Sequence, residues 1–229
     1  MLVKNWMSTD VVTVHVNDSM QHAVKLIKER GVKMLPVLEN GKLVGVVTDR
    51  DLKRASASDA TTLEVHELLY LLTQIKVKSI MTKKPITVSP LTTVEETARI
   101  LLENDISGAP VVDEKGDVVG TITQKELFGV IISLTGVGKK GIQFGFLLDD
   151  RPGSIKDIAD TIREYSGRMA SILSSYERAP EGKRHVYIRM YSVDRDRLND
   201  LKEDLQKKAT ILYMVDERED MCELFEEEC

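Results

Sequence analysis

The chain has 229 residues, of which 42% are hydrophobic and 30% charged, and its net charge is -5. This length can bury a core in more than one domain, and the acidic balance argues against a protein that binds the phosphate backbone of nucleic acid. No stretch approaches the about 18 apolar residues of a membrane span, and residues 1–10 lack the apolar core and cleavage site of a signal peptide, so we expect no membrane insertion, no export and a cytoplasmic location.

The first part of the chain contains one pattern twice. The recurring runs are MSTDVVTV at 7–14 and MTKKPITV at 81–88, MLPV at 34–37 and GAPV at 108–111, and, with one inserted residue, GVVTDRDL at 45–52 and GTITQKEL at 120–127. A unit of this size that recurs with its signals in the same order is a supersecondary module that packs against its own copy. We therefore predict a pseudo-twofold pair, with the cleft between the copies as the first candidate site.

Each copy predicts a short helix, a strand, a helix, two strands and a final helix. In the first copy, Asp18 or Ser19 can cap the first long helix and Gly31 can end it, while Asn40-Gly41 is a strong hairpin signal. The expected elements are strands at 13–16, 35–38 and 43–48, a helix to Arg30 and a helix from Asp49 in the first copy, and a helix at 93–103 with strands at 109–112 and 118–123 in the second.

Two connecting segments precede a third module. Residues 56–74 predict a loop and an amphipathic helix, and TGVGKKG at 135–141 marks a linker that lacks the spacing of a phosphate loop. From 142 to 215 the order is strand, helix, strand, strand, helix, strand, which is the βαββαβ plan of ferredoxin-like domains. The expected strands are 142–148, 169–176, 185–191 and 210–215, and the expected helices are 154–165 and 195–207.

The chain is thus predicted to be an α+β protein. Its expected parts are the first copy at 1–57, a connector helix at 58–76, the second copy at 77–135, a linker at 136–141, the third module at 142–216 and an acidic tail at 217–229. The tail holds Cys222 and Cys229, the only cysteines, and we expect a frayed end with incidental thiols. The histidines are scattered without the spacing of metal ligands, so no metal site is expected.

Thr48 and Asp51 allow two interpretations. They lie three residues apart where a strand ends and a helix begins, so they can form a capping box in which each side chain accepts from the backbone amide of the other. The same geometry suits a nucleotide, because free amides at the helix start attract phosphate while Arg50 assists and the carboxylate accepts from a ribose diol. Residue type alone leaves both interpretations open.

The setting of this motif resembles the CBS domain, the cystathionine beta-synthase type, as a tandem pair or Bateman-type module. The run Gly45-Val-Val-Thr48-x-x-Asp51 follows a Leu-Pro-Val strand in a tandem repeat with Met-Ser or Met-Thr starts. The resemblance implies an adenosine-nucleotide sensor with two clefts, each taking base-facing residues from one repeat and the ribose carboxylate from the other. The candidate ligands are AMP, ADP and ATP, with NAD and S-adenosylmethionine less favoured.

The resemblance also assigns residues to the two clefts. The stronger cleft would join Ile86, Thr87, Gly108, Ala109 and Pro110 to Thr48, Arg50 and Asp51. The weaker cleft would join Val12, Thr13, Met34 and Leu35 to Thr123, Lys125 and Glu126. In the weaker cleft a longer carboxylate replaces the expected Asp and bulkier side chains replace Gly108 and Ala109, so we expect unequal affinities.

The third module resembles an ACT domain. Its turn, DRPGSI at 150–155, is on local grounds an ordinary strand-to-helix turn in which Ser154 and Asp157 cap the helix. In ACT domains such a turn lies near the carboxylate of a bound amino acid, which would assign Asp150, Pro152, Gly153, Ser154 and Ile155 to an amino-acid site. The second strand of the module lacks the Asn that often accompanies such a site, and dimerisation alone is the alternative.

Two CBS repeats followed by one ACT domain resemble bacterial acetoin-utilisation AcuB-like proteins. The resemblance implies a non-catalytic regulatory protein, with no catalytic cofactor, in acetoin or related carbon metabolism. We expect a homodimer that binds an adenine nucleotide and relays its occupancy to the ACT domain or to an unknown regulated protein. The alternative is a dimerisation scaffold whose clefts stay empty.

Overall fold

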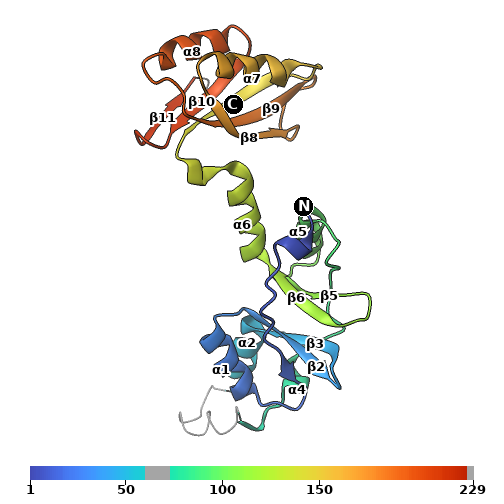
Figure 1. Cartoon of the computed structure of the whole chain (residues 1–229). Helices are drawn as coiled ribbons and strands as arrows, with labels where there is room; N and C mark the ends of the chain where they lie inside the picture. Colours follow the sequence, from blue (N-terminus) through green and yellow to red (C-terminus); the bar gives the residue numbers. More distant parts are fainter. Residues whose placement is uncertain (60–72, 226–229) are drawn as a thin grey trace. The chain divides into compact units, whose positions relative to one another are not determined.

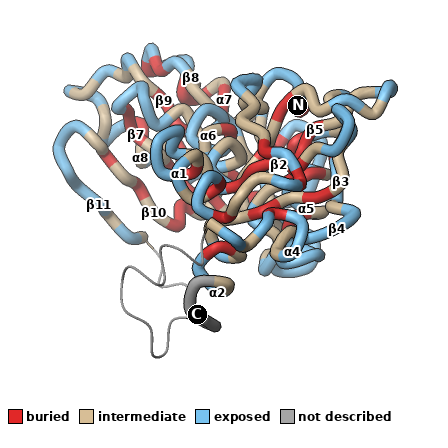
Figure 2. The backbone as a smooth tube through the Cα atoms, turned by 90° about the horizontal axis from the view of Figure 1, so that it is seen from below, coloured by how far each residue is buried: buried red, intermediate tan, exposed pale blue. Residues whose placement is uncertain are grey.

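The computed structural model describes residues 1–59 and 73–225, apart from the side chains of 56–59 (Figure 1). These residues form two compact units, Met1–Phe128 and Gly129–Cys229. The predicted amphipathic helix between the copies lies mostly outside the described residues, so it stays a prediction. Figure 2 shows that buried residues lie along strands such as β2 and β10, whereas the hairpin turns are exposed.

The first copy folds as its local signals predict. Ser19, rather than Asp18, is the N-cap of α1 (Met20–Arg30), because its hydroxyl accepts from the His22 amide at 3.2 Å. Gly31 ends the helix in the left-handed conformation, with φ of 64°. The hairpin of β2 (Met34–Glu39) and β3 (Lys42–Thr48) turns at Asn40-Gly41, where both residues have positive φ.

The remaining elements of the first copy frame this hairpin. The short strand β1 (Val14–His15) pairs in parallel with β2, and α2 (Asp49–Asp59) starts directly after β3. The core of this copy is aliphatic and gathers the buried side chains of α1, β2, β3 and α2. Its fully or nearly fully buried members include Met20, Ala23, Leu35, Val37, Val47, Leu52 and Val77.

The second copy repeats these elements. Thr93 caps α5 (Val94–Glu103) by accepting from the Glu96 amide at 3.1 Å. The hairpin of β5 (Gly108–Val112) and β6 (Val118–Thr123) leads directly into α6 (Gln124–Thr135). Val88 pairs in parallel with Val111 at the place where β1 pairs with β2 in the first copy. The predicted tandem repeat is therefore confirmed element by element.

The two copies exchange their first segments. Ser8 pairs with Thr121 of β6, and the 3-10 turn η1 (Val3–Asn5) bonds through its Val3 amide to the Thr92 carbonyl at 2.9 Å. In the same way, α4 (Val77–Ile80) leads into β4 (Thr82–Lys83), which pairs with β3 of the first copy. Each copy is thus completed by the segment that precedes the other in sequence.

Two glycines permit this exchange. A side chain at Gly120 would lie 2.5 Å from the sulfur of Met7, and one at Gly45 would lie 2.6 Å from the sulfur of Met81. The methionines of the Met-Ser and Met-Thr starts therefore occupy the space that a Cβ would need, once in each copy. Both pairs lie in equivalent places, which is the packing expected of a pseudo-twofold pair.

The second unit is an antiparallel sheet with two helices on one face (Figure 1). Its strands lie in the order β11-β10-β7-β9-β8, and the helices α7 and α8 follow β7 and β9 in the chain. The bounds are β7 (Ile142–Asp149), α7 (Ser154–Glu164), β8 (Arg168–Ser175), β9 (Lys183–Tyr191), α8 (Leu198–Gln206), β10 (Thr210–Asp216) and β11 (Met221–Leu224). The predicted βαββαβ order is confirmed, with the second helix starting three residues later than expected.

The core of the second unit lies between the sheet and the helices. Alternate residues of β7 and β9 face it, among them Phe144, Phe146, Ile188 and Met190, which are fully buried. Phe144 and Phe146 lie with ring centroids 5.7 Å apart. The helices contribute Ile158, Ile162, Leu201 and Leu205, so α7 and α8 cover the same face of the sheet.

The tail departs from the sequence prediction. Residues 217–225 were expected to be a frayed acidic end, yet β11 pairs antiparallel with β10, and Phe225 packs against the core. Lys202 of α8 also binds Glu223 at 2.8 Å. The local composition predicted fraying because it is rich in carboxylates, but the edge of β10 supplies partners that the tail sequence itself does not reveal.

A buried ion pair lies beside this edge. Asp216 is almost completely buried and accepts two hydrogen bonds from Arg195, at 2.7 and 2.9 Å. Burial raises the pKa of the Asp216 carboxyl, but the Arg195 hydrogen bonds and the Arg218 amide lower it by more, so its pKa lies below the usual range. The pair therefore stabilises the unit only while this carboxyl is ionised.

Candidate functional site

Thr48 and Asp51 form the predicted capping box at the junction of β3 and α2. The Thr48 hydroxyl accepts from the Asp51 amide at 3.2 Å, and Asp51 Oδ2 accepts from the Thr48 amide at 3.0 Å. The Thr48 hydroxyl also donates to Asp51 Oδ2 at 2.7 Å. The Asp51 side chain is only 11% exposed. These bonds fix the position of the carboxylate without any ligand.

The other oxygen of Asp51 has a more loosely held partner. Asp51 Oδ1 accepts from Arg54 Nη2 at 3.1 Å, and the Arg54 side chain is 77% exposed. An exposed pair of this kind contributes little energy, so a ligand hydroxyl can compete for Oδ1 at small cost. The capping box and the ribose interpretation are therefore compatible, since the cap uses Oδ2 and the diol would use Oδ1.

The second copy builds the same junction with a longer side chain. Glu126 Oε2 accepts from the Thr123 amide at 2.9 Å and from the Thr123 hydroxyl. The Thr123 hydroxyl in turn accepts from the Lys125 amide at 3.3 Å. Glu126 Oε2 therefore reaches the same threonine groups as Asp51 Oδ2 despite the extra methylene. In both junctions one carboxylate oxygen forms the cap, and the other is left for further contacts.

The base-facing residues of the stronger cleft lie together on the second copy. Ile86 and Thr87 are exposed and directly precede Val88, whose amide donates to the Pro110 carbonyl at 3.1 Å. Gly108 begins β5 beside Thr123, and a Cβ at Gly108 would lie 2.8 Å from the Thr123 methyl group. The structure thus brings Ile86 and Thr87 next to the segment from Gly108 to Pro110.

The equivalent residues of the weaker cleft are more crowded. Val12 and Thr13 precede β1, and Met34 and Leu35 begin β2 opposite Thr48 and Val47. Met34 is 6% exposed and Leu35 is fully buried. Side chains therefore fill this position in the first copy, whereas the second copy has Gly108 and Ala109 there.

The structure groups the predicted residues in two steps. It joins Thr48 to Asp51 and Thr123 to Glu126 by hydrogen bonds. In each copy it also places two base-facing residues just before the segment that pairs with the first hairpin strand, and the others on that strand. Arg50 and Lys125 are exposed at the starts of α2 and α6. That each carboxylate faces the base-facing set of the other copy stays a prediction.

The turn of the second unit places its candidate residues beside a basic side chain. Gly153 precedes α7 with φ of 90°, which explains the glycine. The expected cap by Ser154 and Asp157 is wrong, because Ser154 is already the first helical residue and its hydroxyl accepts from Arg184 at 3.1 Å. Asp157 instead pairs with Arg151 at 2.8 Å.

Arg184 is a residue that sequence reasoning missed. The pairing of Leu148 with Arg184 in the sheet brings it to the turn, from about thirty positions further along the chain. Its buried Nε has no hydrogen-bond partner among the described residues and lies 3.7 Å from Asp150 Oδ1. Asp150 also accepts from the Tyr176 hydroxyl at 3.3 Å. Pro152 is exposed, and Ile155 packs against the core.

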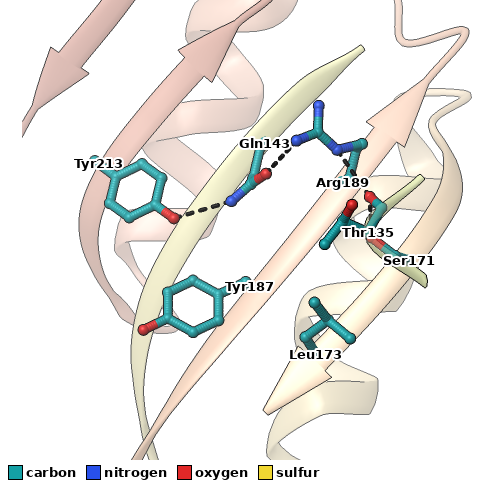
Figure 3. Close-up of a pocket in the computed structure, with 7 residues that line it drawn as sticks. All are labelled: Thr135, Gln143, Ser171, Leu173, Tyr187, Arg189 and Tyr213. Carbon is teal, nitrogen blue, oxygen red and sulfur yellow. Dashed lines mark hydrogen bonds between the residues drawn. The ribbon is translucent and has the colours of Figure 1, made fainter. Parts of the chain in front are cut away.

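A pocket of about 370 Å³ lies on the sheet face that the helices leave open (Figure 3). Its lining residues are Thr135, Gln143, Ser171, Leu173, Tyr187, Arg189 and Tyr213. The sequence analysis also missed this site. A signal for it was present, because residues two apart on a strand lie on the same face, and Tyr187 with Arg189 and Gln143 with Gly145 are spaced in this way.

Within residues 1–59 and 73–225, the structure shows no cluster of three or more His, Cys, Asp or Glu residues that could hold a metal ion. Over the same residues, no helix has the length and apolar character needed to cross a bilayer.

Comparison with known proteins identifies the repeats. A family model for the CBS domain matches residues 3–58 and 77–133. A CBS domain-containing protein of Dictyostelium discoideum is 33% identical over 134 residues, which covers 58% of this chain and 92% of that protein. An inosine-5'-monophosphate dehydrogenase of Korarchaeum cryptofilum is 39% identical over 119 residues, which covers 52% of this chain but 22% of the enzyme.

A solved structure shows the same fold. The CBS domain pair of protein MJ0100, crystallised in complex with 5'-methylthioadenosine and S-adenosyl-L-methionine, superposes with a TM-score of 0.50 at 30% identity and covers 57% of this chain and 95% of that one. Together with the exchanged first segments and the paired capping boxes, these matches identify the repeats of the first unit. The chain belongs to the family of CBS-domain proteins and carries two copies of the domain in tandem.

Proposed function

We propose that this protein is a non-catalytic regulatory protein that binds an adenine nucleotide between its two CBS repeats. The observation that carries the proposal is the carboxylate of Asp51, which the cap holds in place through Oδ2 while Oδ1 pairs only with the exposed Arg54. The binding of adenosine compounds by the CBS pair of MJ0100 supports the same ligand class. The match to the Korarchaeum dehydrogenase covers only 22% of that enzyme, so its catalytic activity does not carry over to this chain.

We propose two clefts of unequal affinity. The stronger would join Ile86, Thr87 and the segment 108–110 to Thr48, Arg50 and Asp51, and the weaker would use Glu126 with the buried Met34 and Leu35. Gly108 adds no side chain of its own beside Thr123, whereas Met34 presents a side chain at the equivalent place. Crowding by Met34 should therefore weaken the Glu126 cleft more than the change of carboxylate length does.

Thermal shift and calorimetry test this proposal. A ligand at 100 times its dissociation constant should stabilise the protein by about 2.7 kcal/mol, with AMP, ADP, ATP, NAD and S-adenosylmethionine tried in turn. Asp51→Asn keeps an oxygen for the Thr48 amide, so it should weaken the tighter site while largely preserving the fold. Asp49→Ala is the matched control, because Asp49 is a neighbouring carboxylate that pairs with Lys53.

Four results would each count against one part of this proposal. If none of the five compounds shifts the melting temperature, the scaffold alternative gains. If Asp51→Asn and Asp49→Ala bind equally well, Asp51 does not contact the ribose. If Asp51→Ala and Glu126→Ala proteins lose sites of equal affinity, the clefts are equivalent. Nucleotide turnover that Asp51→Asn abolishes would instead indicate an enzyme.

We propose that the protein is a homodimer that associates through apolar helix faces. On α6, Phe128, Ile131 and Ile132 are 60%, 55% and 59% exposed and lie at helical spacing on one face. Water contact at such a stripe is unfavourable, which supports its burial against a second copy. Sedimentation of a Phe128→Glu, Ile132→Glu variant should give half the mass of the wild type, and an unchanged mass would refute this surface.

We propose that the second unit acts as an ACT domain and receives the nucleotide signal through α6. This helix starts at the Thr123–Glu126 cap and ends at Thr135, whose carbonyl oxygen accepts from Arg189 and Ser171. An amino acid at the turn from Asp150 to Ile155 would place its carboxylate near Arg184, and dimerisation alone remains the alternative role. A place in acetoin or related carbon metabolism rests on the resemblance in domain order alone.

A further inference from the structure

The pocket on the open sheet face is not one of the ligand sites proposed above, although three of its lining residues, Thr135, Ser171 and Arg189, make the contact between the end of α6 and the sheet. Its volume of about 370 Å³ lies within the range of about 300–1,000 Å³ that is usual for small-molecule sites. Six of its seven lining residues stand on four strands of one sheet, and the seventh, Thr135, ends α6. A site built on a sheet is held more firmly than one built on loops, so its shape is largely formed before a ligand arrives.

One side of the pocket is an aromatic surface. The rings of Tyr187 and Tyr213 lie with centroids 6.4 Å apart at an angle of 29°. Tyr213 covers Gly145, where any side chain would collide with its ring, and its hydroxyl accepts from Gln143 Nε2 at 2.9 Å. Tyr213 is thus held in place before binding, and Tyr187 packs against it, which lowers the entropic cost of stacking a flat ligand against them.

Leu173 extends the apolar surface next to Tyr187, with which it pairs across neighbouring strands, and polar groups complete the pocket. Figure 3 shows Leu173, Ser171 and Thr135 on the side of Tyr187 away from Tyr213, with Gln143 and Arg189 closing one end. Leu173 supplies an aliphatic surface, and the Ser171 hydroxyl donates to the Thr135 carbonyl at 2.9 Å. A ligand that fits this arrangement has an apolar face and one polar edge.

The polar end carries a balanced charge. Arg189 is 6% exposed and uses three of its five N–H donors, one on the Thr135 carbonyl at 2.9 Å, one on Glu217 and one on Gln143. Glu217 neutralises its charge, so an anionic ligand would leave an excess negative charge in a poorly hydrated place, and a cationic ligand would face the guanidinium. A neutral carbonyl oxygen can accept from the remaining N–H groups without either penalty.

We propose that this pocket binds a small, uncharged, planar ring compound that bears a carbonyl group on its edge, such as an amide or a lactam of a heteroaromatic ring. The ring would stack on Tyr187 and Tyr213 beside Leu173, and the carbonyl oxygen would point to Arg189. This site is separate from the clefts of the CBS repeats and from the turn at Gly153.

Titration of the full chain with three simple probes, followed by saturation-transfer NMR, tests the chemistry. Benzamide is planar, uncharged and has a carbonyl group; benzoate has the same ring with a negative charge; cyclohexanecarboxamide has the same amide without a planar ring. We expect benzamide to bind at least about fivefold more tightly than the other two. No detectable benzamide binding at millimolar concentration, or tighter binding of benzoate, would overturn the proposal.

Variants locate the binding. Leu173→Trp should fill the pocket and abolish benzamide binding. Leu224→Trp alters an exposed residue of the edge strand β11, on the same face of the sheet, and should leave benzamide binding unchanged. Tyr187→Leu keeps an apolar side chain and should weaken binding about two- to tenfold through lost stacking. This second variant keeps the test decisive if Leu173→Trp does not fold.

Two outcomes of the variant series would refute the assignment. Full benzamide binding by both Leu173→Trp and Tyr187→Leu would place the probe elsewhere, for example in the CBS clefts. The second outcome has two parts: the wild-type protein does not bind benzamide, and Leu173→Trp has a lower sedimentation mass than Leu224→Trp. This would show that a second copy of the chain covers this face instead.

Discussion

Replacement of Gly120 by alanine tests the exchange of first segments on which the CBS pair depends. An added Cβ would lie 2.5 Å from Met7 Sδ, 3.0 Å from Met7 Cγ and 3.0 Å from the Ser8 carbonyl oxygen. The thioether can move aside, but the Ser8 oxygen belongs to backbone that bonds to Thr121 at 2.9 and 3.0 Å. Relief of the clash therefore requires both a new position for the thioether and a small shift of the segment away from β6.

The size of the effect follows from two opposing contributions. Overpacking of this kind costs about 1–3 kcal/mol, while the lower backbone freedom of alanine in the unfolded chain returns about 0.4–1 kcal/mol. We expect Gly120→Ala to destabilise the first unit by about 1–2 kcal/mol. With a urea dependence of about 2 kcal/mol per molar, in the middle of the usual range, the unfolding midpoint should fall by roughly 0.5–1 M.

Trp6 is a suitable probe for this experiment. It is the only tryptophan and directly precedes Met7, so its fluorescence reports on the segment that packs against β6. Gly129→Ala is the matched control, because Gly129 lies inside α6 and an added Cβ there meets nothing within 4 Å. That change should keep or raise stability, since glycine disfavours a helix interior by about 1 kcal/mol. If Gly120→Ala also keeps or raises the midpoint, Met7 does not pack on β6.

Three further substitutions probe other parts of the chain. Gly45→Ala should destabilise the first unit by a similar amount, and in a double-mutant cycle with Met81→Ala the combined loss should be smaller than the sum of the single losses, whereas strict additivity would argue against the contact. Asp216→Asn should cost the second unit about 2 kcal/mol at pH 7. Because the folded pKa of Asp216 is lowered, this contribution is complete above the unfolded pKa of about 3.9 and disappears as the pH falls through the folded value. The stabilities of the wild type and the variant should therefore converge at acid pH, as measured by circular dichroism. A stability difference that widens below about pH 4 would contradict this. Phe225→Ala should destabilise the second unit by about 1 kcal/mol through lost packing. An unchanged urea midpoint would instead support the original prediction of a frayed tail.

The sequence predicted those features of the fold that depend on short-range signals. The Ser19 cap, the left-handed Gly31 and the Asn40-Gly41 turn each act within a few residues, so their meaning is legible without the rest of the chain. The elements of the second copy could be predicted because its sequence repeats that of the first. For the same reason the βαββαβ order of the second unit could be predicted from local periodicity.

Contacts between distant segments escaped prediction. The run that starts at Met7 reads as the beginning of the first copy, yet it pairs with β6 of the second. Nor does the tail composition reveal the open edge of β10 on which β11 forms. Arg184 reaches the turn at Gly153 only through strand pairing. Each of these depends on which strand edges and glycine surfaces the fold leaves available, which the local sequence does not encode.

The candidate nucleotide site shows why the two interpretations of the motif need not compete. A carboxylate kept ready for a ribose in an empty cleft would be costly if it lacked partners, because a desolvated anion needs hydrogen bonds. The cap supplies them, through the Thr48 amide and hydroxyl, and it does so in a way that stabilises α2 as well. The same argument applies to Glu126 in the second copy, so a variant that keeps the cap should keep the fold of the empty protein. Binding and stability can therefore be separated at this one residue, with Asp51→Asn expected to lose affinity and Asp51→Ala expected to lose both.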